Sequence, residues 1–136
     1  MNEPSVLFIC VSNRGKSVMA ETLMRRRHGT LVVASSAGTN AALGGTVNDL
    51  SARVLEEIGA PVDAHEPRQV TDDLMVAADL VVIVGTAHLD APPGVPVEVW
   101  AVDEPSERGI DGVARMRLIR DDIAARVDDL ATRLHT

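Results

Sequence analysis

One stretch near the N-terminus decides the fold, and it reads Val6-Leu-Phe-Ile-Cys10-Val-Ser-Asn-Arg-Gly15-Lys-Ser17-Val-Met-Ala-Glu21. Its first four residues are all apolar, which is typical of a strand buried on both faces. A short loop follows, and apolar residues then recur at helical spacing from Met19 to Met24, in a pattern that runs on to His28. The stretch therefore predicts a buried strand, a loop and a helix.

The loop between the strand and the helix is suited to an anion. In this geometry the loop amides converge on one point above the helix N-terminus, where the peptide dipoles favour negative charge. Cys10 lies at the mouth of the loop, and Arg14 or Lys16 adds positive charge that favours the thiolate, the nucleophilic form of cysteine. We therefore predict an oxyanion site with Cys10 as its nucleophile. The predicted oxyanion-binding residues are Val11, Ser12, Asn13, Arg14, Gly15, Lys16 and Ser17.

Two other interpretations of this loop fit its residues less well. A lone cysteine after a buried strand is most often a small core residue, but the anion-binding loop behind Cys10 argues against that role. Gly15-Lys16-Ser17 also ends the nucleotide-binding P-loop motif, yet Cys10 occupies the position of the first glycine of that motif. The oxyanion site remains the favoured interpretation.

Composition limits the classes of protein that this chain can form. Its 136 residues, 46% hydrophobic, suit one domain over residues 1–136. A net charge of −7 argues against a nucleic-acid partner. No apolar stretch reaches the length of a signal peptide core or a membrane span, so we expect a cytoplasmic protein without a membrane partner. With one cysteine, and histidines that lack metal-ligand spacing, we expect no metal site and a resolving thiol from another molecule.

The rest of the chain alternates between strand and helix patterns. We predict strands at residues 31–36, 79–84 and 97–100, and helices at 47–58, after Thr71, and from 110 to the end. This alternation predicts an α/β fold: a three-layer, four-stranded parallel sheet flanked by helices. Ligands of such sheets bind beyond the carboxyl ends of the strands, where the strand order reverses. Cys10, Ser36, Gly85 and Asp103 all fall at predicted strand ends.

The spacing Cys10-x5-Lys16-Ser17 close to the N-terminus, followed by Met-Ala-Glu21, resembles the phosphate loop of low-molecular-weight tyrosine phosphatases and the thiol-coupled arsenate reductases related to them. The resemblance implies the low-molecular-weight phosphotyrosine phosphatase fold. The segments 36–39 (Ser-Ala-Gly-Thr) and 65–69 (His-x-x-Arg-Gln) resemble family segments that lie beside the loop and support it. One departure is informative: the loop cation of the family is normally Arg, and the ammonium of Lys16 cannot make the planar two-pronged contact of a guanidinium.

The Gly-Lys-Ser ending of the loop resembles actinobacterial arsenate reductases that use mycothiol. The tail is similar to theirs as well, in the run Arg115-Met-Arg-x-Ile-Arg-Asp-x-Ile-x-x-Arg-Val127 and in Glu104-Pro. In the segment that corresponds to Glu104-Pro, related enzymes have an Asp before the Pro, and this acid protonates the leaving oxygen. Here Glu104 occupies the position of that Asp and Asp103 comes one residue earlier, so the resemblance assigns the role to Glu104 or to Asp103.

The resemblance implies an arsenate reductase that acts as an arsenate-mycothiol transferase. Arsenate would bind in the Cys-x5-Lys-Ser loop with Lys16 neutralising its charge, and mycothiol, as co-substrate, would take up the arsenic in an arseno-mycothiol adduct that a mycoredoxin-like protein reduces. No tightly bound cofactor is expected. One alternative is a low-molecular-weight tyrosine phosphatase-like phosphomonoesterase, disfavoured by Lys16 and by a chain with no Tyr, one Phe and one Trp to stack on a phenyl ring. The other is a non-catalytic oxyanion-binding module.

Overall fold

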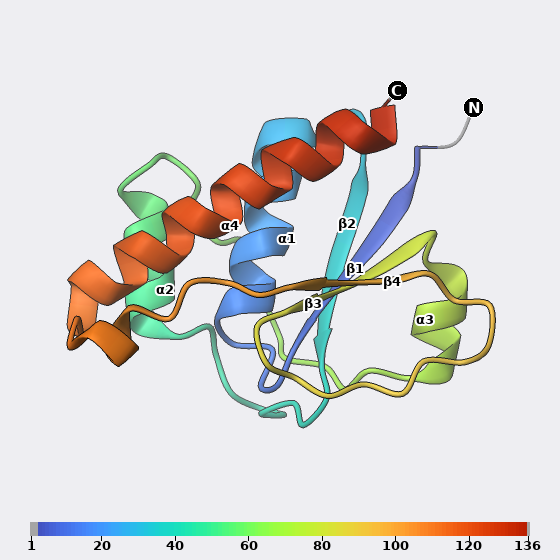
Figure 1. The fold of residues 1–136 in the computed structure, drawn as a ribbon, viewed down its shortest axis with the longest axis horizontal. Helices are drawn as coiled ribbons and strands as arrows, with labels where there is room; N and C mark the ends of the chain where they lie inside the picture. Colours follow the sequence, from blue (N-terminus) through green and yellow to red (C-terminus); the bar gives the residue numbers. More distant parts are fainter. Residues whose placement is uncertain (1–2, 136) are drawn as a thin grey trace.

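The computed structural model describes residues 3–135, and its centre is a parallel sheet (Figure 1). The strands are β1 (Ser5–Cys10), β2 (Val33–Gly38), β3 (Leu80–Val84) and β4 (Val97–Trp100). They pair in the order β2-β1-β3-β4, each with its neighbours in parallel. The predicted four-stranded parallel sheet is therefore confirmed.

Helices cover both faces of this sheet. They are α1 (Lys16–His28), α2 (Asp49–Glu56), α3 (Asp72–Ala77), the short 3-10 helix η1 (Pro105–Arg108) and α4 (Gly112–His135). The helices α1, α2 and α4 pack on one face and α3 on the other, which confirms the three layers (Figure 1). Among residues 3–135, none of the helices combines the length and the apolar run that a membrane span requires.

Element boundaries differ by a few residues from the prediction, for reasons that depend on hydrogen bonds. The strand predicted at 31–36 is observed at Val33–Gly38, because its register pairs Val33 with Ser5 of β1. The helix predicted at 47–58 begins only after Asn48, whose side chain accepts a hydrogen bond from the backbone N–H of Ser51. Thr71 caps α3 in the same way, as the sequence predicted.

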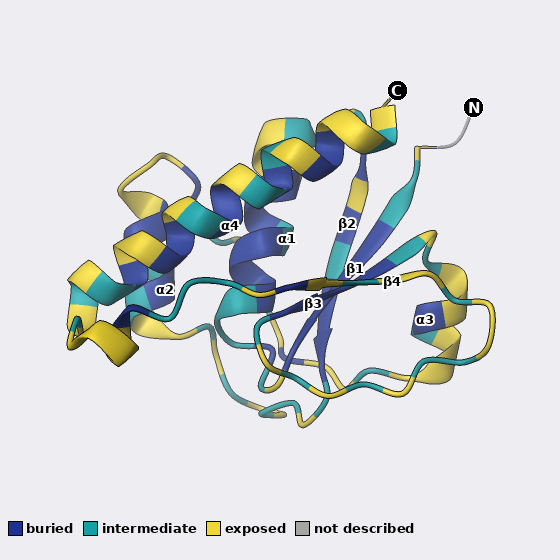
Figure 2. Ribbon diagram, viewed as in Figure 1, coloured by how far each residue is buried: buried dark blue, intermediate teal, exposed yellow. Residues whose placement is uncertain are grey.

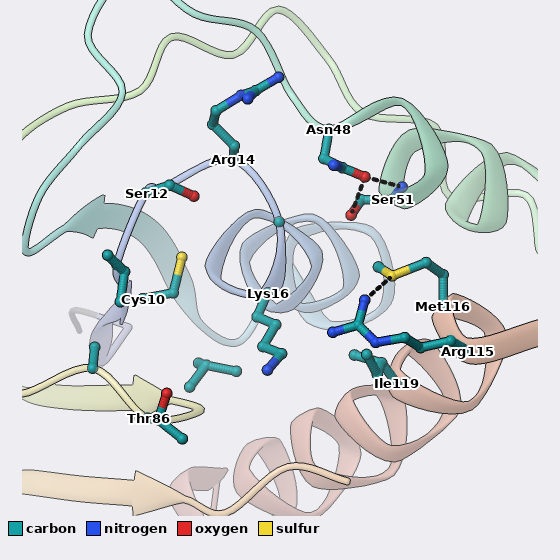
Figure 3. Close-up of a pocket in the computed structure, with 14 residues that line it drawn as sticks. Cys10, Ser12, Arg14, Lys16, Asn48, Ser51, Thr86, Arg115, Met116 and Ile119 are labelled. Atoms are coloured by element: carbon teal, nitrogen blue, oxygen red, sulfur yellow. Dashed lines mark hydrogen bonds between the residues drawn. The ribbon is translucent and has the colours of Figure 1, made fainter. Parts of the chain in front are cut away.

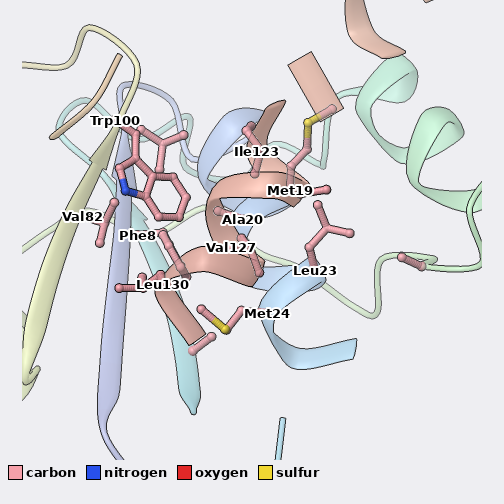
Figure 4. Close-up of a cluster of buried hydrophobic side chains, with 14 of the residues drawn as sticks. Phe8, Met19, Ala20, Leu23, Met24, Val82, Trp100, Ile123, Val127 and Leu130 are labelled. Carbon is pink, nitrogen blue, oxygen red and sulfur yellow. The ribbon is translucent and has the colours of Figure 1, made fainter. Parts of the chain in front are cut away.

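Side chains of β1 alternate between the two cores. Val6 and Phe8 point into the larger core, which lies under α1, α2 and α4, while Leu7 and Ile9 point into the smaller core under α3. Both faces of β1 are thus buried, as its uninterrupted apolar run predicted. In the larger core the centroids of the Phe8 and Trp100 rings lie 5.5 Å apart, and Figure 4 shows the two side chains. Figure 2 shows buried and exposed residues alternating along α4, as expected of a helix with one face in this core.

The topology places a candidate site at the end of β1. From β1 the chain crosses to β2 on one side, then returns to β3 on the other side, so the strand order reverses at β1. Loops at such a reversal diverge and leave room for a ligand beyond the carboxyl ends of the strands. Cys10 is the last residue of β1 and therefore lies at this point.

Candidate functional site

The loop after β1 turns its carbonyl groups outward. Five consecutive carbonyl oxygens each accept a hydrogen bond from a neighbouring segment. These bonds run from Thr39 N to Cys10 O, Asn40 N to Val11 O, Ala42 N to Ser12 O, His65 Nε2 to Asn13 O, and Asn48 N to Arg14 O, at 2.7–3.0 Å. No peptide bond among the described residues is cis, and in a trans peptide the N–H points away from the C=O. The N–H groups of residues 11–15 therefore point to the inner side, the arrangement that a nest of amides needs to bind an anion.

Cys10 is held at the mouth of this loop. The residue is 7% exposed, and its Sγ lies 2.9 Å from the Oγ of Ser17 in the first turn of α1. Asn13 Nδ2 donates to the same Oγ at 2.9 Å, so the Ser17 hydroxyl has its own hydrogen free for the sulfur. The sulfur thus has a fixed direction and a hydrogen-bond donor behind it.

Asn13 supports the loop from beneath. It is fully buried and has a φ of 58°, a left-handed conformation that Asn adopts more readily than most residues. Its Nδ2 also donates to Ser36 Oγ at 2.9 Å, and its Oδ1 accepts from the backbone N–H of Arg68 at 3.0 Å. The Asn13 side chain therefore ties the loop to β2 and to segment 65–69.

The two flanking segments hold the loop from the outside. A Cβ on Gly38 would lie 2.5 Å from Val11 O, so only glycine allows β2 to approach this closely. Arg68 donates from Nε to Ser36 O at 2.9 Å, and its own carbonyl accepts from Gly38 N. These contacts confirm the supporting role that the resemblance implied for segments 36–39 and 65–69.

A cavity of about 280 Å³ opens above the loop (Figure 3). Of the residues predicted from sequence, those that line it are Cys10, Val11, Ser12, Arg14, Gly15 and Lys16. Asn13 and Ser17 do not line it, because both side chains are buried beneath the loop. Sequence reasoning missed the other residues that line the cavity, which are Asn48, Ser51, Val84, Thr86, Ala87, Arg115, Met116 and Ile119. Of these, Arg115, Met116 and Ile119 come from α4 and form the wall opposite the loop (Figure 3).

The two loop cations take different directions. Lys16 lies across the end of β3, where a Cβ on Gly85 would come within 3.4 Å of its Nζ, and this Nζ is 3.6 Å from Glu104 Oε1. Arg14 instead donates from Nε to Thr46 O at 2.6 Å, and Figure 3 shows its side chain pointing away from Lys16. Lys16 is therefore the loop cation that is directed toward the far wall.

Both predicted proton donors are engaged by arginine. Arg115 grips Glu104 with two N–H groups at 2.7 and 2.8 Å, and the Ser106 hydroxyl donates to the same carboxylate, so the pKa of Glu104 lies far below its usual value. Arg108 grips Asp103 at 2.8 and 3.0 Å and lowers the pKa of that carboxyl. Neither acid lines the cavity. Proton donation from either remains a prediction, and it requires the arginine contact to be released.

The sequence carries a signal that points to Arg115. This residue lies four residues before Ile119, so both occupy the same face of α4, the face that carries the apolar stripe. A charged residue at the edge of a buried stripe needs a partner or a function there.

Among residues 3–135, no group of three or more His, Cys, Asp or Glu side chains is placed to hold a metal ion.

The fold and the site together define a class of protein: a parallel α/β domain that presents one thiol beside a loop of inward-pointing amides, at the point where the strand order reverses. Comparison with known families identifies the class further. Residues 5–136 match the family described as low molecular weight phosphotyrosine protein phosphatase, and the chain belongs to this family.

Relatives within the family carry two kinds of name. A putative arsenate reductase of Halobacterium salinarum is 34% identical over 130 residues, which cover 90% of this chain and 87% of that protein. The solved thioredoxin-dependent arsenate reductase of Corynebacterium glutamicum superposes with a TM-score of 0.77 at 29% identity; the match covers 97% of this chain but only 62% of that one. The tyrosine phosphatase AmsI of Erwinia amylovora has the same fold, with a TM-score of 0.86 at 19% identity and coverage of 99% and 95%.

Proposed function

We propose that the protein is an arsenate reductase that works as an arsenate-mycothiol transferase. The observation that carries the proposal is the loop itself, with its carbonyls bonded outward, its amides turned inward and Cys10 at its mouth. An arsenate reductase among the relatives supports arsenate as the oxyanion. The single cysteine supports an external thiol, because the chain has no second thiol with which to form a disulfide of its own.

The first step is the transfer of arsenic to sulfur. The inward amides and Lys16 stabilise the negative charge of bound arsenate, and this stabilisation grows as charge builds up on the oxygens during attack. The Cys10 thiolate attacks arsenic, an S–As bond forms, and one As–O bond breaks as that oxygen leaves as water after protonation. Arsenic remains pentavalent in this step.

The second step passes the arsenic to mycothiol. The mycothiol thiolate attacks arsenic, a new S–As bond forms, and Cys10 leaves as a thiolate ready for another cycle. The thiolate of a mycoredoxin-like protein then attacks the mycothiol sulfur of the arseno-mycothiol adduct and forms a mixed disulfide with it. The S–As bond breaks, its electron pair stays on arsenic, and arsenic leaves as trivalent arsenite. The electrons thus come from outside this chain.

The leaving oxygen needs a proton, and Glu104 or Asp103 is the proposed donor. Glu104 is favoured because its Oε1 is 3.6 Å from the Nζ of Lys16, a residue that lines the cavity. The pH dependence of kcat/KM identifies the donor when Glu104→Gln and Asp103→Asn are compared with the unmodified protein. If kcat/KM no longer falls at high pH in only one of the two variants, the residue replaced in that variant is the proton donor. If kcat/KM still falls at high pH in both variants, the proton comes from solvent.

The proposed function is tested by arsenate-dependent NADPH oxidation with mycothiol, a mycoredoxin and the matching reductase. We expect oxidation that stops when mycothiol is omitted and when Cys10 is replaced in Cys10→Ser. A thioredoxin system in place of mycothiol is the second arm, because the Corynebacterium glutamicum structure is that of a thioredoxin-dependent enzyme. Turnover with thioredoxin alone would refute the mycothiol assignment, and full turnover by Cys10→Ser would remove Cys10 from the mechanism.

A phosphomonoesterase is the second candidate, since the family includes tyrosine phosphatases. The residues lining the cavity include no aromatic side chain, which leaves a phenyl ring without a stacking partner. Hydrolysis of p-nitrophenyl phosphate measures this activity directly. A protein that binds arsenate and phosphate but turns over neither would instead be the non-catalytic oxyanion-binding module.

A further inference from the structure

Arg115 reaches the cavity from α4, on the wall opposite the loop. Figure 3 shows its guanidinium extended from the helix toward Lys16. Its Nε and Nη2 donate to the two oxygens of Glu104, and Nη1 makes a longer contact of 3.4 Å with Met116 Sδ. A guanidinium has five N–H donors, so the contacts among the described residues leave two of them for another acceptor.

The same carboxylate oxygen contacts cations from two elements. Glu104 Oε1 is 2.7 Å from Arg115 Nη2 and 3.6 Å from Lys16 Nζ. All three side chains are partly exposed, at 24–30% of their surface, so solvent and small ions can reach them. One negative charge therefore lies between two positive charges at the edge of the cavity. A tetrahedral oxyanion arriving above the loop would offer both cations an acceptor of the same kind as this carboxylate.

We propose that Arg115 is a second oxyanion-binding residue of this site, which exchanges its carboxylate partner Glu104 for the bound oxyanion. The exchange replaces one charge-assisted, two-pronged contact with another, so the guanidinium does not lose its partner. It also supplies the planar contact that the ammonium of Lys16 cannot make. This inference rests on the proposed function for the choice of arsenate, but the binding that it describes can be measured without turnover.

The exchange has a consequence for Glu104. Release of Arg115 removes the contact that contributes most to the lowered pKa of this carboxyl. Glu104 would then bind a proton more readily when the oxyanion is present than when the site is empty. Oxyanion binding and the proposed proton donation would thus be linked through one arginine.

The chain offers a matched control on the same helix. Arg117 also grips a carboxylate with two N–H groups, those of Nε and Nη2, at 2.6–3.2 Å from Glu57. It does not line the cavity. Arg117→Gln therefore removes a comparable ion pair from α4, while it leaves the candidate oxyanion site intact.

The test is titration calorimetry with arsenate and, in parallel, with phosphate. The proteins are the unmodified chain, Arg115→Gln, Arg115→Lys and Arg117→Gln, each checked by thermal melting. We expect Arg115→Gln to weaken the binding of both oxyanions about tenfold or more, and Arg117→Gln to change it less than about twofold. Arg115→Lys keeps the positive charge but loses the planar two-pronged contact of the guanidinium. Its oxyanion affinity should therefore lie between that of the unmodified protein and that of Arg115→Gln. If Arg115→Gln does not fold, the loss in Arg115→Lys decides the question.

Other results would contradict either the role of Arg115 or the proposed transferase activity. Equal affinities for the unmodified protein and both Arg115 variants would overturn the role of Arg115, as would an equally large loss in Arg117→Gln. Failure of the folded, unmodified protein to bind either oxyanion would overturn it too. Absence of arsenate-dependent turnover, with oxyanion binding and the Arg115 effect intact, would reject only the proposed transferase activity.

Discussion

Replacement of the buried Asn13 by alanine tests how the loop is held in shape. The side chain makes three hydrogen bonds, two from Nδ2 to serine hydroxyls and one from the Arg68 N–H to Oδ1. Each is worth about 1 kcal/mol. A φ of 58° costs alanine about 1 kcal/mol more, because its Cβ crowds the carbonyl oxygen. We therefore expect Asn13→Ala to lower the free energy of unfolding by about 4 kcal/mol, a large part of the roughly 5–15 kcal/mol of a typical domain.

Asn13→Gly separates the two contributions. Glycine adopts the left-handed conformation without strain, although it also gives the unfolded chain more freedom. It lacks the hydrogen bonds just as alanine does. We expect Asn13→Gly to be more stable than Asn13→Ala by about 0.5–1 kcal/mol, and still well below the unmodified protein.

The assay is urea unfolding followed by the fluorescence of Trp100, which is the only tryptophan of the chain and is buried against Phe8. The slope of the transition should stay constant while its midpoint falls. Oxyanion binding, measured at a temperature where each variant is folded, should fall with it, because the loop amides lose their fixed direction. A loss below about 1.5 kcal/mol in Asn13→Ala would refute the reasoning, since it is smaller than two of the three hydrogen bonds.

Two further predictions concern an ion pair and a glycine. Arg117 and Arg120 lower the pKa of Glu57 from its usual 4.5 to about 2, so their contact stabilises the fold above pH 4.5 and is lost as the pH falls toward 2. The difference in Tm between the unmodified protein and Glu57→Gln should shrink across that range, and an equal difference at pH 7 and pH 2.5 would contradict this. Gly85→Ala places a methyl group 3.3–3.4 Å from Lys16 at a φ of +100°, so we expect a loss of stability of about 1–2 kcal/mol and weaker phosphate binding. An unchanged Tm in Gly85→Ala would show that the backbone there is not strained.

The sequence predicted the elements whose signals are local. The apolar run before Cys10 is contiguous, and its burial on both faces follows from the alternation of side chains along a strand. The start of β2 was placed two residues too early, because residues 31–32 are as apolar as those of a strand, while the pairing of Val33 with Ser5 fixes where the ladder begins. The pairing register of two strands that are distant in the sequence cannot be predicted from the residues of either strand alone.

The candidate site divides in the same way. The loop from Cys10 to Ser17 is contiguous, so its spacing alone placed a thiol, a set of amides and a cation together. The sequence by itself thus determined which residues form this loop and which thiol lies at its mouth. It could not show that Asn13 and Ser17 face downward, that Glu104 is ion-paired, or that Arg115 forms the far wall. Only the tertiary structure decided these points, because the packing of α4 against α1 brings side chains about a hundred residues apart to one carboxylate, and such proximity depends on the whole core rather than on local spacing.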